Sequence, residues 1–156
     1  MPTRPIPVPS RDTAPFWQGL LEGELRLPRC AACRRLHYPP PPRCPHCLDS
    51  ALVWTGLSGK ARLSSWTTVH IDLCPGIPPP FVIGEVELVE QAGLVMVALL
   101  TGVEPAGLHP GLPLTCAFHR ETGASDIAVA YPEFHIDRGQ PGLPDKPPPL
   151  KSLHQE

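Results

Sequence analysis

The chain has 156 residues, enough for one compact domain and a small appended module. Thirteen basic and 15 acidic residues give a formal charge of −2, and aromatic residues make up 6%. Such a surface has little long-range attraction for nucleic-acid phosphates or anionic lipid, and few stacking platforms for single strands. Because the 24 prolines break helices and end strands, we expect a mainly β protein with one short helix.

The N-terminal segments are interpreted as an arm and a helix. Residues 1–11 are rich in proline and predict an extended, poorly ordered arm. Residues 12–24 predict a short helix, with Asp12 or Thr13 as its N-cap and Gly23 as its stop.

Two C-x2-C pairs separated by ten residues lie in the segment 25–50, at Cys30, Cys33, Cys44 and Cys47. Two residues between thiolates let both sulfurs reach one ion from a tight turn, and two such pairs complete a tetrahedron. We expect a ribbon with a structural Zn²⁺, because protein ligands fill all four positions and leave none for water or substrate. Iron in the same cage stays an alternative, since sulfur tetrahedra accept both metals.

The interpretation of the cysteines depends on whether the cellular compartment is reducing or oxidising. No basic region followed by an apolar run opens the chain, so we expect a cytoplasmic protein, in which paired cysteines indicate metal. Cys74 and Cys116 stand alone, which favours loop or core thiols over nucleophiles. His37 and His46 flank the cysteine pairs and are expected to be surface imidazoles.

Residues 51–136 alternate between short strands and loops rich in proline or glycine. A short strand over 52–54 is followed by five that predict a small closed or nearly closed Greek-key barrel, which removes exposed strand edges. Those five strands are expected over 61–71, 81–89, 94–100, 114–119 and 127–134. The last segment, 137–156, is rich in proline again and predicts a flexible tail.

No catalytic signature is visible in the sequence. Phosphate-binding loops, dinucleotide-binding fingerprints, nucleophile elbows and zinc-protease motifs are all absent from it. We therefore expect no independent catalytic centre and nominate no catalytic residue.

Two segments carry candidates for contact with a ligand or a partner. Alternation along 61–71 places the aromatic Trp66 on one face with polar and cationic groups, which suits a nucleotide-like ligand if that face is outward. The alternative, weighted equally, is that Trp66 fills the end of the barrel. On the helix, Phe16 is expected to pack, whereas Trp17 suits packing or an interface. The candidates are Phe16, Trp17, Arg62, Trp66, Thr68 and His70.

Taken in order, these motifs resemble a known family. The segments PFWQGL, RCAACRRLHYPPPPRCPHC, LSGKARLSSWTTVH and GLHPGLPLTCAFH, within residues 12–135, are similar to proteins with a rubredoxin-like zinc ribbon followed by an OB-fold, long filed as a domain of unknown function. Two stretches depart from the family pattern, the loop 74–80 and the proline-rich tail after Phe134.

The resemblance implies a non-catalytic accessory subunit in lipid, steroid or polyketide-type metabolism. It would dock on an acyl-CoA-processing enzyme, either a thiolase-like enzyme, a lipid-transfer-protein-type thiolase or aldolase, or a hot-dog hydratase, and help to hold the CoA thioester. A hetero-oligomer without nucleic acid or membrane follows from this interpretation. The alternative is a ribbon and OB protein that binds single-stranded nucleic acid, against which the charge of −2 argues.

Overall fold

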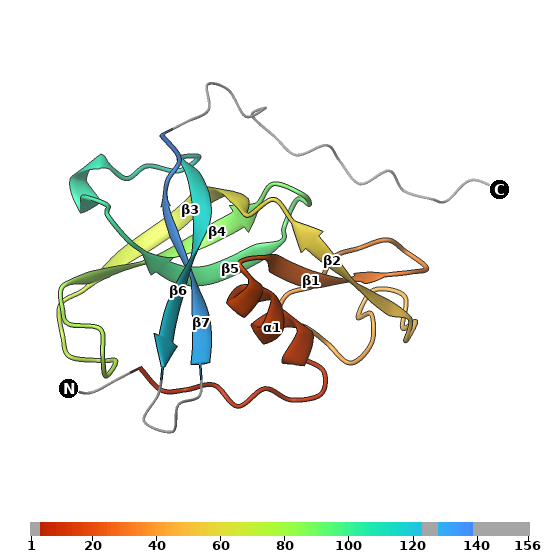
Figure 1. Cartoon of the computed structure of the whole chain (residues 1–156). Coiled ribbons are helices and arrows are strands. Elements are labelled where there is room, and N and C mark those ends of the chain that lie inside the picture. The colour runs from red at the N-terminus through yellow and green to blue at the C-terminus, as the bar shows by residue number, and fades with distance from the viewer. Residues whose placement is uncertain (1–3, 123–127, 139–156) are drawn as a thin grey trace.

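The computed structural model describes residues 4–122 and 128–138 and is drawn in Figure 1. Within these residues the expected mainly β fold with one short α-helix is confirmed. The tail predicted over 137–156 lies outside the described residues from position 139 onward. The elements are α1 (Ala14–Glu22), β1 (Leu25–Cys30), β2 (Leu52–Leu57), β3 (Lys60–Val69), β4 (Phe81–Leu88), β5 (Val95–Leu100), the 3₁₀ turn η1 (Pro105–Gly107), β6 (Pro113–Thr122) and β7 (Ala128–Ile136).

A separate two-stranded sheet, made by β1 and β2, forms the scaffold of the ribbon. The strands are antiparallel, with Leu25 opposite Leu57 and Cys30 opposite Leu52. Because β2 pairs with β1 and not with the barrel, the ribbon hairpin extends past the boundary expected at residue 50. This hairpin fixes the start of the first cysteine pair at the end of β1.

The remaining strands close into a barrel in the order β3–β4–β5–β7–β6, and β6 returns to β3. Neighbouring strands are antiparallel, except that β5 and β7 run parallel. The ring closes where Lys60 and Arg62 of β3 pair with Thr115 and Pro113 of β6. This order is the five-stranded Greek-key barrel of the OB-fold, and closure leaves the apolar strands without a free edge.

The barrel interior is filled by alternate residues of each strand. Leu63, Val86, Met96 and Phe134 are almost wholly buried, and burying each such side chain stabilises the fold by about 1.5–3 kcal/mol. Gly84 is required by close packing, because a Cβ there would lie 2.8 Å from Cδ1 of Leu100.

A β-bulge interrupts the alternation along β3. Leu63 pairs with Val86 but Ser65 pairs with Glu85, so the intervening Ser64 has no partner on β4. Such an extra residue reverses which side chains point inward beyond it. Trp66, which pairs with Gly84, consequently lies on the inner side, whereas before the bulge the inner positions are Ala61 and Leu63.

The helix α1 joins the ribbon to the barrel, because it contacts β1 on one side and β6 and β7 on the other (Figure 1). It begins after Thr13 and ends at Gly23, whose φ of 80° is the left-handed conformation that suits glycine at a helix end. Phe16 and Leu20 are buried against the core. The predicted short helix is confirmed, although Thr13 makes no side-chain capping hydrogen bond at its start.

The N-terminal arm lies against the barrel. The guanidinium of Arg4 is 2.7 Å from the carboxylate of Glu133 on β7 and 3.1 Å from that of Glu121 on β6. It also sits 5.3 Å above the ring of Tyr131, whose hydroxyl donates a hydrogen bond to the carbonyl of Pro5. The arm was expected to be extended and poorly ordered, and over its described residues these contacts give it a defined place.

Candidate metal centre and partner-binding residues

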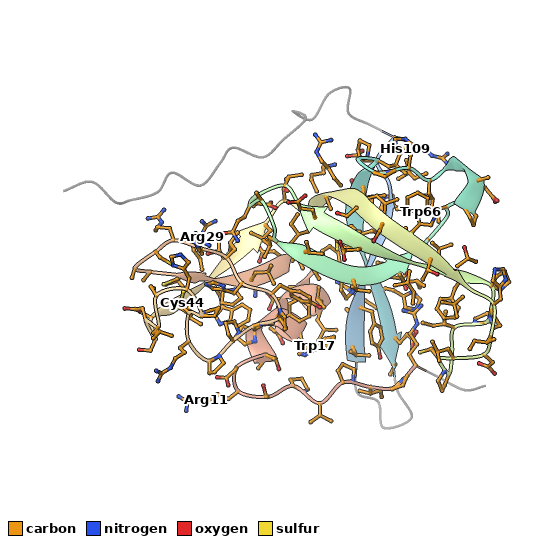
Figure 2. All side chains as sticks on the ribbon, turned by 180° about the vertical axis from the view of Figure 1, so that it is seen from behind. Arg11, Trp17, Arg29, Cys44, Trp66 and His109 are labelled. Carbon is orange, nitrogen blue, oxygen red and sulfur yellow. The ribbon has the colours of Figure 1, made fainter. Side chains whose placement is uncertain are left out.

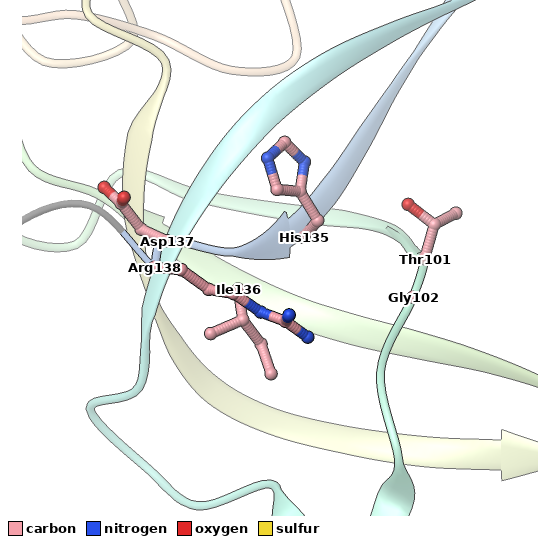
Figure 3. Close-up of a pocket in the computed structure, with 6 residues that line it drawn as sticks. All are labelled: Thr101, Gly102, His135, Ile136, Asp137 and Arg138. Atoms are coloured by element: carbon pink, nitrogen blue, oxygen red, sulfur yellow. The ribbon is translucent and has the colours of Figure 1, made fainter.

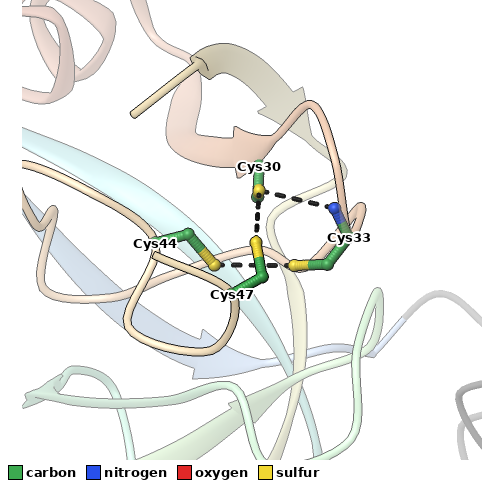
Figure 4. A group of neighbouring side chains, drawn as sticks. All are labelled: Cys30, Cys33, Cys44 and Cys47. Carbon is green, nitrogen blue, oxygen red and sulfur yellow. Dashed lines mark hydrogen bonds between the residues drawn. The ribbon is translucent and has the colours of Figure 1, made fainter. Parts of the chain in front are cut away.

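The four predicted ligands meet at the end of the ribbon (Figure 4). All four Sγ atoms of Cys30, Cys33, Cys44 and Cys47 lie within 4.8 Å of one another. The Cys30–Cys47 and Cys33–Cys44 sulfur pairs are each 3.5 Å apart.

These distances suit a zinc ion. Zn–S bonds of about 2.3 Å in a tetrahedron place neighbouring sulfurs about 3.8 Å apart, close to the separations of both pairs. The thiol groups of this four-cysteine cluster therefore fit a structural metal of the zinc-ribbon type, and they would supply every coordination position.

Each cysteine pair sits in a turn of the same geometry. In the first turn the N–H of Arg34 donates to the carbonyl of Cys30, and in the second the N–H of Leu48 donates to the carbonyl of Cys44, both at 2.9 Å. Arg34 and Leu48 both have left-handed backbones, with φ of 65° and 64°. The two turns thus use the same backbone path to present their sulfurs to a common centre.

Burial and hydrogen bonding shift the pKa values of Cys33 and Cys44 in opposite directions. Burial raises the pKa of the Cys33 thiol to about 12. Burial acts in the same direction on Cys44, but hydrogen bonds from the N–H groups of Cys47 and His46 outweigh it and lower the pKa of Cys44 to about 6. Cys44 is thus the readiest thiolate in the metal-free cluster, and a bound cation would deprotonate the others.

One neighbour of the cluster was misjudged from the sequence. His37 is half-buried, and its Nε2 lies 3.3 Å from the Sγ of Cys44. It was expected to be a surface imidazole near the ribbon and not a fifth ligand, and the group of candidate ligands among the described residues does leave it out. A ring N–H at this position stabilises negative charge on the sulfur without joining the ligand set.

The aromatic candidates of α1 pack against other aromatic rings of the chain. Phe16 is buried, as expected, and its ring centroid lies 5.2 Å from that of Trp17 and 5.9 Å from that of Tyr38. Trp17 also meets Tyr131 edge-on at 6.5 Å. It lines a 190 Å³ cavity between the arm and the helix, so part of its ring stays accessible.

The four candidates of β3 do not form one surface. Arg62 precedes the bulge and pairs with Glu87, whereas Trp66 and Thr68 follow it and pair with Gly84 and Val82. Trp66 is half-buried against the core, so the alternative that it fills the barrel end is the better description. The expected common face is wrong because the bulge reverses the alternation, and His70 lies exposed just beyond the strand.

A 310 Å³ hollow at one end of the barrel contains none of the predicted residues (Figure 3). Residues at the end of β7 line it together with Thr101 and Gly102, which follow β5. The Asp137 carboxylate in its wall lies 2.7 Å from the Lys60 ammonium. No local pattern in the sequence signals this hollow, because its walls come from segments more than thirty residues apart.

Comparisons with known proteins agree with this architecture. Residues 17–53 match the family model described as the ChsH2 rubredoxin-like zinc ribbon domain, and residues 54–119 match the ChsH2 C-terminal OB-fold domain. Among curated proteins, a probable enoyl-CoA hydratase alpha subunit from Thermomonospora curvata is 30% identical over 92% of this chain. The 3-oxo-4,17-pregnadiene-20-carboxyl-CoA hydratase alpha subunit of Mycobacterium tuberculosis is 36% identical over 72% of it.

The chain spans 41% and 35% of the length of these two relatives. Among solved structures, the Ltp2-ChsH2(DUF35) aldolase includes a chain that is 28% identical, with a TM-score of 0.72 over 84% of this chain and 98% of that one. A DUF35 protein of unknown function from Sulfolobus solfataricus shares the fold at 15% identity, with a TM-score of 0.56 over 82% of this chain and 87% of that one.

A four-cysteine ribbon followed by a closed five-stranded barrel defines the class as a zinc-ribbon plus OB-fold protein. Both parts match in the same order as in the two family models. The chain belongs to the ChsH2 family, also called DUF35. Within the residues that the structure describes, no helix has the length and apolar character needed to cross a membrane.

Proposed function

We propose that this chain is a non-catalytic subunit of a hetero-oligomeric enzyme that either hydrates the acyl group of a CoA thioester or cleaves a carbon–carbon bond in it. The observation that carries the proposal is the 30% identity to a hydratase alpha subunit over 92% of the chain. The likeness to a chain of the Ltp2-ChsH2 aldolase supports the same role from the structural side.

The four-cysteine cluster supports a structural and not a catalytic role. Four protein sulfurs around one ion leave no position for a substrate or an activated water. We infer that the metal is zinc, which holds the ribbon hairpin and the two cysteine turns together. The zinc ion then stabilises the ribbon as a rigid module for docking.

The buried charge of the barrel is also structural. Among the described residues, Glu133 is the buried charged side chain, and the guanidinium of Arg4 lies 2.7 Å from it. A carboxylate used as a general base needs access to its substrate, whereas this one is covered by the arm. The reacting groups would accordingly come from the partner enzyme.

The names of the relatives suggest the substrate class. One acts in the hydration of a pregnadiene carboxyl-CoA, a steroid thioester, and another is named for enoyl-CoA hydration. We propose that the complex containing this chain handles CoA thioesters of bulky or polycyclic acyl groups. Whether hydration or carbon–carbon cleavage follows depends on the enzyme subunit that it joins.

Co-expression tests the proposal. The chain would be produced with an Ltp2-type aldolase, and separately with a hydratase beta-type subunit, from the same genome, and each pair analysed by size-exclusion chromatography and thioester turnover. We expect one pair to co-elute and the enzyme to lose solubility or activity when this chain is omitted. Separate elution of both pairs, with full enzyme activity without this chain, would refute the proposal.

A further inference from the structure

The two cysteine turns hold side chains where the backbone favours glycine. Arg34 and Leu48 follow the second cysteine of each turn, at φ values of 65° and 64°. A side chain in the left-handed region is strained, and a bulky apolar one is uncommon there. Such an outlier points to a function for the side chain when the fold itself does not need it.

The fold gains little from either side chain. Leu48 is 67% exposed, and Arg34 is exposed as well. Within the described chain, the turns use only the backbone of these residues, through the hydrogen bonds from Arg34 to Cys30 and from Leu48 to Cys44. Glycine would make the same hydrogen bonds without strain, so neither side chain is needed by its own turn, and both are free to contact another molecule.

The solvent face of the β1–β2 hairpin ends at the same cluster, because Cys30 is the last residue of β1 and its Sγ lies 3.5 Å from that of Cys47, next to Leu48. Arg29 and Val53 are cross-strand partners, so their side chains share a face, and Val53 is 58% exposed. The guanidinium of Arg29 donates to the carbonyl of Arg34 at 3.1 Å, which brings the two arginines together. We call Arg29, Arg34, Leu48 and Val53 the ribbon tip; Figure 2 shows Arg29 at this end of the molecule, on the same side as Cys44.

Charge separates the ribbon from the barrel. Segment 25–50 holds five arginines, no lysine and one aspartate, a formal +4, whereas segment 51–136 holds three basic and eight acidic residues, a formal −5. A zinc ion with four thiolates would add −2 to the ribbon and leave it cationic. The guanidinium group of arginine suits a protein interface because it is planar and weakly hydrated. It also forms bidentate hydrogen bonds with carboxylates.

We propose that the ribbon tip docks on the partner enzyme subunit, on a face where acidic side chains surround an apolar centre. The inference rests on the proposed function, which supplies the partner. The exposed side chains of Leu48 and Val53 pack against the apolar centre of the partner's face. Arg29 and Arg34 form ion pairs with the acidic side chains around it. Strain in the free chain is the cost of presenting these groups ready for contact.

Two other occupants fit the observations less well. A nucleic acid would have to approach a barrel of charge −5, with Glu85 exposed on β4, one of the strands with which OB-folds hold single strands. A second copy, with its acidic barrel against this ribbon, would make a head-to-tail contact that continues from copy to copy into a ring or an open chain, and no relative found by comparison is described as such an assembly.

The test compares two double variants of the full chain. Arg34→Gly/Leu48→Gly removes a guanidinium and an exposed apolar side chain from the ribbon tip. Arg138→Gly/Val8→Gly removes the same groups elsewhere, at an exposed arginine after β7 and at a valine that is 92% exposed. Biolayer interferometry against the immobilised enzyme subunit from the complex gives the affinities, and thermal unfolding and zinc content report on the fold.

We expect the ribbon variant to bind at least tenfold more weakly, with a melting temperature equal to or above that of the wild type and one zinc per chain. The control variant should bind within twofold of the wild type. Binding within twofold by the ribbon variant would overturn the inference, although the complex and thus the proposed function would stand. Loss of zinc or a lowered melting temperature would overturn it too, because the side chains would then serve the fold. If only homo-oligomerisation or binding of a single-stranded oligonucleotide changed, the named partner would be wrong.

Discussion

Removal of the Arg4 side chain tests how strongly the arm is held on the barrel. In the structure its guanidinium approaches two carboxylates, and the side chains of Arg4 and Glu133 are only 12% and 9% exposed. Arg4→Ala would leave the Glu133 charge buried without its cation. We expect the change to destabilise the protein.

The magnitude lies between two limits. Breaking a fully buried ion pair costs about 3–5 kcal/mol, whereas an exposed pair contributes about 0–1 kcal/mol. Neither Arg4 Nε nor Glu133 Oε1 makes a hydrogen bond with suitable geometry in the described chain, so the attraction is mainly Coulombic. Water also reaches Glu133 once the arm leaves. We therefore expect Arg4→Ala to lower the free energy of unfolding by about 2 kcal/mol, including about 0.5–1 kcal/mol from the cation–π contact with Tyr131.

A double-mutant cycle isolates the pair. Urea unfolding, followed by tryptophan fluorescence, would be measured for Arg4→Ala, Glu133→Gln and both together, with Arg11→Ala at an exposed arm position as the control. We expect a coupling free energy of about 1.5 kcal/mol between Arg4 and Glu133, and a change within about 0.5 kcal/mol for the control. A coupling below about 0.5 kcal/mol would refute the interpretation of the arm as an electrostatically held segment.

Three further predictions concern the metal centre and the core. Cys44→Ser should abolish zinc binding and unfold the ribbon, whereas Cys116→Ser should keep one zinc per chain. Elemental analysis measures the zinc and circular dichroism the folding. Equal zinc content in the two variants would contradict the assignment of the four cysteines as zinc ligands. Gly84→Val should lower the free energy of unfolding by about 1–3 kcal/mol, because its side chain overlaps Leu100, whereas Gly107→Ala, with no atom within 4 Å of the new Cβ, should change it little in urea titrations. Burial raises the pKa of Cys116 to about 12 from an ordinary 9.0, so the folded state favours the thiol over the thiolate. The contribution of this thiol to the free energy of unfolding is complete below about pH 9 and is lost as the pH rises toward 12. Iodoacetamide at pH 8 should therefore label Cys74 much faster than Cys116, as measured by mass spectrometry.

The barrel is predictable from the sequence because each strand carries its own signal. Alternation, proline-rich loops and the apolar run of β5 are local patterns, and closure of the barrel follows from the need to cover apolar edges. The bulge at Ser64 escapes such reasoning, since serine before serine marks no break in alternation. One extra residue there places the side chain of Arg62 on the opposite side of the strand from those of Trp66 and Thr68. The predicted common face is therefore not formed.

The cysteine cluster is predictable for a similar reason, because its spacing encodes the metal geometry. Contacts between distant segments are not encoded in this way. The hydroxyl of Tyr131 and the carbonyl of Pro5 meet across 126 positions, and His37 reaches Cys44 only through the path of the intervening turn. Proline content alone describes the arm as extended but says nothing of where it binds.

The central claim, a zinc-bearing subunit of a hetero-oligomeric acyl-CoA enzyme, is tested most directly by native mass spectrometry of the co-expressed complex. The account predicts an assembly in which each copy of this chain carries one zinc ion and is bound to the enzyme subunit. Metal-free chains, or chains found only alone or with copies of themselves, would contradict it.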